Sequence, residues 1–278
     1  ALIKMVVVPL VFFSLLVGVA SLGDFRALGR LGGRTILYFT MTTIMALVIG
    51  VGLANVMNPG SVLSADDRAA LLAEYQGAAG NTVARAAEAP SLVDQIVGVD
   101  PTNPVKALAE GEMLQVIFVA ALLFKVVGTT GLTVLAALGY YAFVVVLGLL
   151  THLFITYGTV IKLGARLPVF KFLGAIKEAL LVAFSTSSSS ATLPVTMEAC
   201  EENVNVRPRI TSFVLPLGAT VNMDGTALYQ GVAAIFIAQI YGMDLSVGQQ
   251  VTIVVSATLA SIGAAGVPGA GMITLAMV

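Results

Sequence analysis

Long runs of hydrophobic residues alternate with polar segments along this chain. The runs at residues 5–22, 35–57 and 131–163 approach or exceed the ~20 residues with which a helix crosses the hydrocarbon core of a bilayer. In lipid, every backbone N–H and C=O group must be satisfied within the protein, and a helix does this with its own hydrogen bonds. The pattern therefore predicts an all-α, multi-pass membrane protein embedded in a lipid bilayer.

Lysine and arginine residues gather in two groups beside these runs, at residues 26–34 and at residues 162–177. Cytoplasmic loops of membrane proteins carry an excess of such residues, so we expect both groups in the cytoplasm. Residues 61–112 are polar and mainly acidic, and we expect a long, partly helical excursion on the far side of the membrane. If the apolar stretch at 113–128 were a full span, the next long helix would begin and end in the cytoplasm. Either that stretch is not a full span, or a span is missing near residues 125–131.

The hydrophobic runs become half-length after Lys177. As a helix, residues 176–186 would rise only about 16 Å, roughly half a bilayer. A serine-rich stretch at 185–190 follows, and a second short apolar helix starts at Thr192. A flexible serine-rich linker would not be flanked by apolar half-helices on both sides. We therefore expect a re-entrant hairpin at about 176–206 that enters from the cytoplasm.

The next span, at about 210–241, carries Asn-Met-Asp-Gly-Thr at residues 222–226 in its middle. Asparagine, aspartate and glycine favour leaving a helix, so it should unwind between Gly218 and Thr226. Asp224 has no basic residue nearby in sequence, and an ionised side chain near the bilayer midplane costs several kcal/mol unless it is compensated. We predict that Asp224 meets a mobile cation.

A second interrupted segment begins with the half-length helix 248–260. The stretch 261–271 holds four glycines and a proline and cannot continue that helix. A second re-entrant hairpin at about 248–278, entered from the opposite side, would mirror the first. Such paired interruptions are typical of inverted repeats in secondary transporters, whose ligands bind where the interrupted helices meet. Half-helix N-termini favour an anionic substrate group and backbone oxygens favour a hard cation, which pairs a substrate carboxylate with sodium.

Composition agrees with the membrane assignment: 58% of the 278 residues are hydrophobic and 10% charged, and the mean hydropathy is +0.99. Soluble domains average roughly 25% charged residues. The net charge of −1 provides no positive electrostatic field that would attract nucleic acid. Cys200 is the single cysteine of the sequence, cannot form an internal disulfide, and is assigned no function. The single His152 is expected to be a packed residue that donates to a carbonyl, outside the site. The sequence offers no pair of nucleophile and general base, so nothing in it indicates an enzyme.

Three stretches, 187–194, 216–229 and 260–271, resemble the glutamate transporter family of dicarboxylate or amino acid:cation symporters, which includes the excitatory amino acid transporters. The resemblance implies a homotrimer in which a static scaffold supports a transport domain that moves like an elevator. It implies one scaffold helix in residues 1–30. Residues 58–128 would hold the extracellular excursion and a further scaffold helix. The transport domain would then comprise the helix at 31–57 and residues 129–278, with both hairpins.

The resemblance also implies site residues. One sodium ion would be held by Gly218 and Asn222. A second ion would be held by Thr220, Met223, Ser261, Ile262 and Ala264. A third ion would be held by Phe39, Thr42, Thr43, Asn222 and Asp224. The substrate would contact six residues of the hairpins and the unwound helix: Ser187, Ser189, Thr226, Gly266, Val267 and Gly271.

The sequence departs from the family pattern in several places. The first and last family helices are absent, so the chain is expected to be truncated, and the family's further scaffold helix is missing near residues 125–131. Ser187 stands where some prokaryotic relatives have arginine. Gln230 stands where proton-coupled relatives have glutamate, and it cannot carry a proton. The expected function is sodium-coupled symport of L-aspartate or L-glutamate in a cell membrane. The alternatives are neutral amino acids or C4-dicarboxylates on the same fold, or a passive ion channel.

Overall fold

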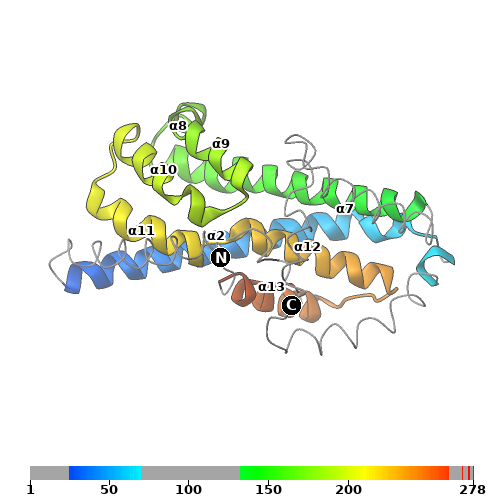
Figure 1. The fold of residues 1–278 in the computed structure, drawn as a ribbon. Helices are drawn as coiled ribbons and strands as arrows, with labels where there is room; N and C mark the ends of the chain where they lie inside the picture. Colours follow the sequence, from blue (N-terminus) through cyan, green and yellow to red (C-terminus); the bar gives the residue numbers. More distant parts are fainter. Residues whose placement is uncertain (1–24, 65, 70–131, 263–270, 272–274, 276–277) are drawn as a thin grey trace, which may run out of the picture.

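A computed structural model describes residues 25–64, 66–69, 132–262, 271, 275 and 278, and within these ranges every regular element is helical. Figure 1 shows their arrangement. The elements in chain order are α2 (Phe25–Met57), the 3₁₀ turn η1 (Pro59–Val62), α7 (Leu132–Thr151), the π-helical turns η3 (His152–Tyr157) and η4 (Val160–Gly164), α8 (Val169–Ala175), α9 (Lys177–Thr186), α10 (Ser189–Glu202), α11 (Pro208–Val221), α12 (Asp224–Ile240) and α13 (Val247–Ile262).

Two helical segments in the described part of the chain are long and apolar enough to cross a membrane. They cover Gly29–Val62 and Thr133–Gly164 and have mean hydropathies of 2.1 and 2.2. They match the runs predicted at 35–57 and 131–163, while the run at 5–22 lies outside the described residues. From the basic group at residues 26–34 we also expect a loop between two spans; this expectation is wrong, because these residues are helical and belong to α2. Arginine is a good helix former, so basic residues at the end of a span continue the helix.

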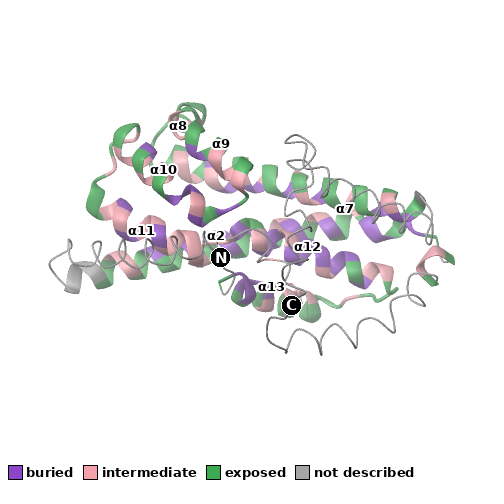
Figure 2. Cartoon of the chain, in the orientation of Figure 1, coloured by how far each residue is buried: buried purple, intermediate pink, exposed green. Residues whose placement is uncertain are grey.

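Helix α12 packs against both α2 and α7, which also contact each other, and the three run side by side in Figure 1. Figure 2 shows buried residues concentrated along α12 and where α2 meets it. Leu228 and Val232 of α12 are fully buried and form one core with Ala46 and Val51 of α2. Helices in lipid approach closely through small residues. At Gly50 of α2, an added Cβ would lie 3.0 Å from the Leu228 carbonyl oxygen, so glycine allows this close crossing.

The end of α7 changes its winding where it approaches the start of α12. Residues His152–Tyr157 and Val160–Gly164 form π-helical turns, in which backbone hydrogen bonds join residue i to residue i+5. Such turns are rare and occur frequently at functional sites. Because the winding is looser, His152 and Tyr157 lie on the same side, with ring centroids 4.8 Å apart.

The serine-rich stretch forms a tight turn between α9 and α10, which pack against each other. Ser187 has a left-handed backbone (φ 50°) and ends α9. Ser188 caps α10, since its side chain accepts a hydrogen bond from the Ala191 N–H at 3.2 Å. The break predicted at 185–190 is therefore too wide, because Ser189 and Ser190 are helical and only two residues leave the helix.

The helix predicted at 210–241 is interrupted, as expected, at its Asn-Met-Asp motif. Helix α11 ends at Val221 and α12 begins at Asp224, so only Asn222 and Met223 are non-helical. The interruption is narrower than the predicted 218–226 but lies within it. Helix α13 covers the predicted half-length helix at 248–260, and the glycine-rich stretch after it falls mostly outside the described residues.

Candidate functional site

The carboxylate of Asp224 is the centre of a buried polar cluster. Asp224 begins α12 and is only 4% exposed, so neighbouring groups must satisfy its oxygen atoms. The Thr43 hydroxyl of α2 lies 2.5 Å from Asp224 Oδ1. Thr43 also lies 2.9 Å from the carbonyl oxygen of Phe39, and the Thr42 hydroxyl donates to the same carbonyl at 3.0 Å. One turn of α2 thus presents three oxygen atoms at this carboxylate.

Asn222 joins the same cluster from the break between α11 and α12. With its amide nitrogen turned toward the cluster, it donates to Asp224 Oδ1 at 2.9 Å and to Thr42 Oγ1 at 3.1 Å. Leaving the helix at Asn222 lets its side chain point to α2. One complete set of predicted sodium ligands therefore lies together in the structure: Phe39, Thr42, Thr43, Asn222 and Asp224.

The other carboxylate oxygen, Asp224 Oδ2, faces the π-helical turn η3. The Tyr157 hydroxyl donates to it at 2.6 Å, and His152 Nε2 lies 3.3 Å from it. The expectation that His152 packs against a carbonyl outside the site is wrong. His152 is 3% exposed, and its other ring nitrogen, Nδ1, has no hydrogen-bond partner among the described residues.

The sequence contained one indication that His152 belongs to the site and none that Tyr157 does. A lone ionisable side chain in an apolar span is a functional hypothesis by default, and His152 is such a residue. Tyrosine is common in membrane helices, especially near their ends, and Tyr157 therefore attracts no attention in the sequence. Its position at Asp224 depends on the π-helical winding, which the hydrophobic pattern does not show.

A cavity of about 350 Å³ opens beside Asp224. Its walls come from four elements, so it exists only in the folded protein. Leu149, His152 and Tyr157 line it from α7 and η3, and Ser189 lines it from α10. The segment from Asn222 to Thr226 completes the wall. The cavity therefore connects the Asp224 cluster with two predicted substrate contacts, Ser189 and Thr226.

The remaining predicted sodium ligands that the structure describes bond to residues three or four positions away in the sequence. The Gly218 carbonyl accepts from the Asn222 N–H at 3.0 Å, and the Met223 carbonyl accepts from the Ala227 N–H at 2.9 Å. Thr220 Oγ1 donates to Leu217 O at 3.1 Å. Ser261 Oγ, which is fully buried, donates to the Thr258 carbonyl at 2.9 Å. Ile262 ends α13, and Ala264 lies outside the described residues. Within the described part of the chain, no hydrogen bond joins Thr220, Met223, Ser261 and Ile262 to one another.

The other predicted substrate contacts are described only in part. Ser187 is exposed at the turn between α9 and α10. Gly271 lies against α12, where its carbonyl accepts from Gln230 Nε2 at 3.1 Å. A Cβ added to Gly271 would overlap the Tyr229 hydroxyl, so this close approach needs glycine. Gly266 and Val267 lie outside the described residues.

The profile of the sodium:dicarboxylate symporter family matches the chain over residues 1–123 and 117–278. The two matched stretches overlap at residues 117–123, close to where the sequence predicts a missing span. A proton/glutamate-aspartate symporter of Escherichia coli is 35% identical over 319 residues, which cover 99% of this chain and 72% of that protein.

Two further relatives cover the chain to the same extent. A proton/sodium-glutamate symport protein of Bacillus subtilis is 33% identical over 99% of this chain and 73% of its own length. A C4-dicarboxylate transport protein of Rhodospirillum rubrum is 35% identical over 99% of this chain and 70% of its own length. The chain therefore belongs to the sodium:dicarboxylate symporter family, a family of membrane transporters and not of enzymes.

Proposed function

We propose that this protein is a sodium-coupled symporter that carries L-aspartate or L-glutamate across a cell membrane. The observation that carries the proposal is the buried Asp224 carboxylate, on which oxygen atoms of α2 and of the α11–α12 break converge. The relatives from E. coli and B. subtilis, a proton/glutamate-aspartate symporter and a proton/sodium-glutamate symport protein, support cation-coupled transport of these substrates.

The chemistry of the cluster favours sodium as the coupling ion. Phe39 offers a carbonyl oxygen, Thr42 and Thr43 offer hydroxyls, and Asp224 offers a charged oxygen, which is the ligand type that hard cations prefer. The Thr43 hydroxyl is within reach of two acceptors, so it can turn its hydrogen to Phe39 and present lone pairs to a cation beside Asp224. Gln230 has no titratable proton and supports the same preference.

The other predicted ligands complete the proposal. Two more sodium ions would bind at Gly218 and Asn222 and at the group of Thr220, Met223, Ser261, Ile262 and Ala264. The substrate would lie in the cavity between Ser189 and Thr226 and extend to Ser187, Gly266, Val267 and Gly271. Because this cavity adjoins Asp224, a cation bound there would order the segment that also holds the substrate.

We further propose an elevator motion in a homotrimer. Residues 31–57 and 129–278 would move as the transport domain, with re-entrant hairpins at 176–206 and 248–278, and residues 1–30 and 58–128 would form the scaffold. The shared core of α2 and α12 supports the inclusion of α2 in the moving part.

Uptake by the complete protein in proteoliposomes tests the proposal. Labelled L-aspartate should accumulate against its gradient when sodium is high outside, and an inward proton gradient alone should not drive it. Accumulation driven by protons without sodium would reject sodium coupling. Equilibration without accumulation under either gradient would indicate a passive channel.

Competition between substrates separates the two best candidates. The C4-dicarboxylate transport protein of R. rubrum is as similar as the E. coli symporter, which favours C4-dicarboxylates as the second candidate. An excess of unlabelled L-glutamate should block aspartate uptake, whereas succinate, alanine and serine should not. Stronger inhibition by succinate than by glutamate would move the assignment to dicarboxylates, and inhibition by alanine or serine would move it to neutral amino acids.

A further inference from the structure

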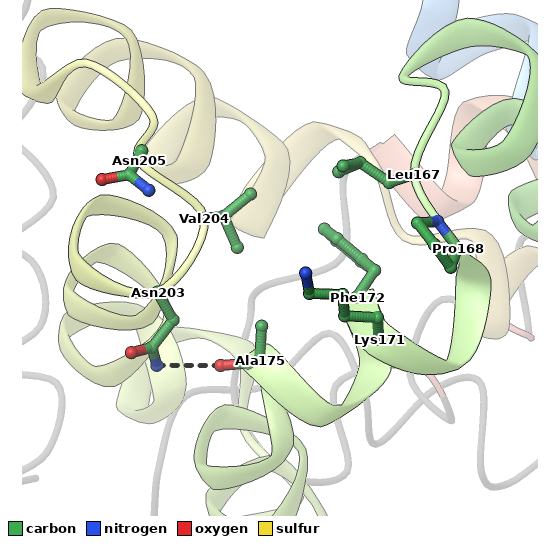
Figure 3. A pocket seen from close by; sticks show the side chains of 8 residues that line it. All are labelled: Leu167, Pro168, Lys171, Phe172, Ala175, Asn203, Val204 and Asn205. Carbon is green, nitrogen blue, oxygen red and sulfur yellow. Dashed lines mark hydrogen bonds between the residues drawn. The ribbon is translucent and has the colours of Figure 1, made fainter.

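A second pocket lies apart from the Asp224 cluster, between α8 and the segment that joins α10 to α11 (Figure 3). Its volume is about 220 Å³. Leu167, Pro168 and Phe172 give it an apolar wall, and Lys171 and Asn205 contribute polar groups. Figure 3 shows the Lys171 amine extending from α8 into this space. None of the described residues that line the pocket is acidic.

The two sides of the pocket are held together. Asn203 Nδ2 donates to the Ala175 carbonyl at 2.9 Å, which ties the end of α10 to the end of α8 (Figure 3). Arg166 and Asn205 both have left-handed backbones, with φ angles of 55° and 59°. Arg166 turns the chain just before α8, and Asn205 turns it in the segment between α10 and α11. The shape of the pocket is therefore set by these two turns and by the hydrogen bond between Asn203 and Ala175.

The pocket lies in a basic segment just past a membrane span. The second long apolar segment ends at Gly164, so α8 follows at the edge of the hydrocarbon core. Lys162, Arg166, Lys171 and Lys177 are all exposed and lie within this short stretch. Clusters of four or more such residues next to a span attract anionic lipids electrostatically.

The same segment also exposes large apolar side chains. Leu163 is 70% exposed and Phe170 is 79% exposed, although both are strongly hydrophobic. A segment that combines exposed apolar residues with basic ones lies favourably at a membrane surface, with its apolar side chains at the headgroup and acyl boundary. A small soluble anion would make no use of Leu163 and Phe170.

We propose that α8 and its flanking residues bind anionic phospholipid at the cytoplasmic membrane surface. Phe170 and Leu163 insert at the acyl boundary, and Lys171 meets the headgroup phosphate at the mouth of the pocket. Lys162 and Arg166 add attraction for the net negative headgroup. This interaction does not depend on the proposed transport function.

The absence of tryptophan from the sequence offers a direct test. Phe170→Trp introduces one fluorophore at an exposed position of α8. The complete protein carrying this change, with any tryptophan outside these 278 residues first replaced by phenylalanine, is reconstituted in vesicles that contain equal mole fractions of phosphatidylglycerol and phosphatidylcholine, with bromine on the acyl chains of one lipid at a time. We expect stronger quenching by brominated phosphatidylglycerol than by brominated phosphatidylcholine, and equal quenching by the two in 0.5 M salt.

Charge removal then identifies the residues. Lys162→Gln combined with Lys171→Gln should lower the preference for phosphatidylglycerol roughly thirtyfold. Arg209→Gln is the matched control, because Arg209 is an exposed basic residue on α11 outside the segment, and it should leave the preference unchanged. A preference that survives the double substitution would overturn the role of these lysines.

Three other outcomes would also overturn the proposal. Equal quenching by both lipids at low salt would mean ordinary membrane contact without headgroup selection. Absence of quenching by either lipid would place α8 away from the bilayer. Loss of the preference in 10 mM inorganic phosphate at unchanged ionic strength would identify a pocket for free anions rather than for lipid.

Discussion

The Tyr157 hydroxyl donates a hydrogen bond of 2.6 Å to Asp224 Oδ2, and His152 approaches the same oxygen from the same turn. In an α-helix, residues five apart differ in direction by about 140° beyond a full turn. The π-helical winding of His152–Tyr157 removes much of this difference. The Asp224 carboxylate is therefore held from two sides, by α2 at one oxygen and by η3 at the other.

Tyr157→Phe should weaken sodium activation of transport. The change removes a hydrogen bond to a charged group, which is worth about 1.5–3 kcal/mol, so the sodium concentration for half-maximal uptake should rise roughly tenfold. Tyr140→Phe is the control, since Tyr140 lies on α7 and stacks on Phe143 away from Asp224. Sodium titration of aspartate uptake measures both. An equal response of the two variants would mean that Tyr157 does not position the carboxylate.

Thr43→Val should also raise the sodium requirement, by roughly tenfold or more, since valine keeps the shape but loses the oxygen that lies between Phe39 and Asp224. Thr43→Ser restores the hydroxyl and should recover most of the affinity. Thr40→Val is the matched control on the same helix, because the Thr40 hydroxyl bonds only to the Ile36 carbonyl. If Thr40→Val and Thr43→Val behave alike in sodium titrations, the loss is structural.

Asp224→Asn in the complete protein should abolish sodium-dependent uptake while the protein still folds. The amide has nearly the same size and keeps hydrogen bonds, but it lacks the charge that attracts the cation. Folding is checked by gel filtration and thermal unfolding, and Asp244→Asn, at an exposed acid between α12 and α13, serves as the control. Undiminished sodium-driven uptake in Asp224→Asn would reject the assignment of this residue.

Gly50→Ala should destabilise the contact between α2 and α12. The added Cβ would lie 3.0 Å from the Leu228 carbonyl oxygen and 3.2 Å from a Val232 methyl group, and a backbone atom cannot move aside easily. Overpacking of this kind costs about 1–3 kcal/mol. Gly52→Ala, two residues further along α2, meets nothing within 4 Å and should leave the melting temperature unchanged or raise it. Equal melting temperatures for the two variants would contradict the close crossing.

Several elements could be predicted because local properties of the sequence decide them. The long hydrophobic runs gave the two spans, and the helix-breaking residues at 222–226 gave the interruption before α12. The serine stretch gave the turn at Ser187 and Ser188, although the helices on both sides extend further into it than expected. These features follow from side-chain transfer energies and backbone preferences within a few residues.

The sequence alone therefore determined that the chain is a helical membrane protein and where its helices are interrupted. It also determined that Asp224 places a carboxylate in the middle of an apolar span. Only the tertiary structure decided which groups meet this carboxylate. Thr43 lies 181 residues before Asp224 and His152 lies 72 residues before it, so their contacts depend on how α2 and α7 pack around α12. Hydrophobicity is averaged along a helix, whereas hydrogen bonds need particular atoms within about 3 Å, and the winding of one π-helical turn sets that distance for His152 and Tyr157.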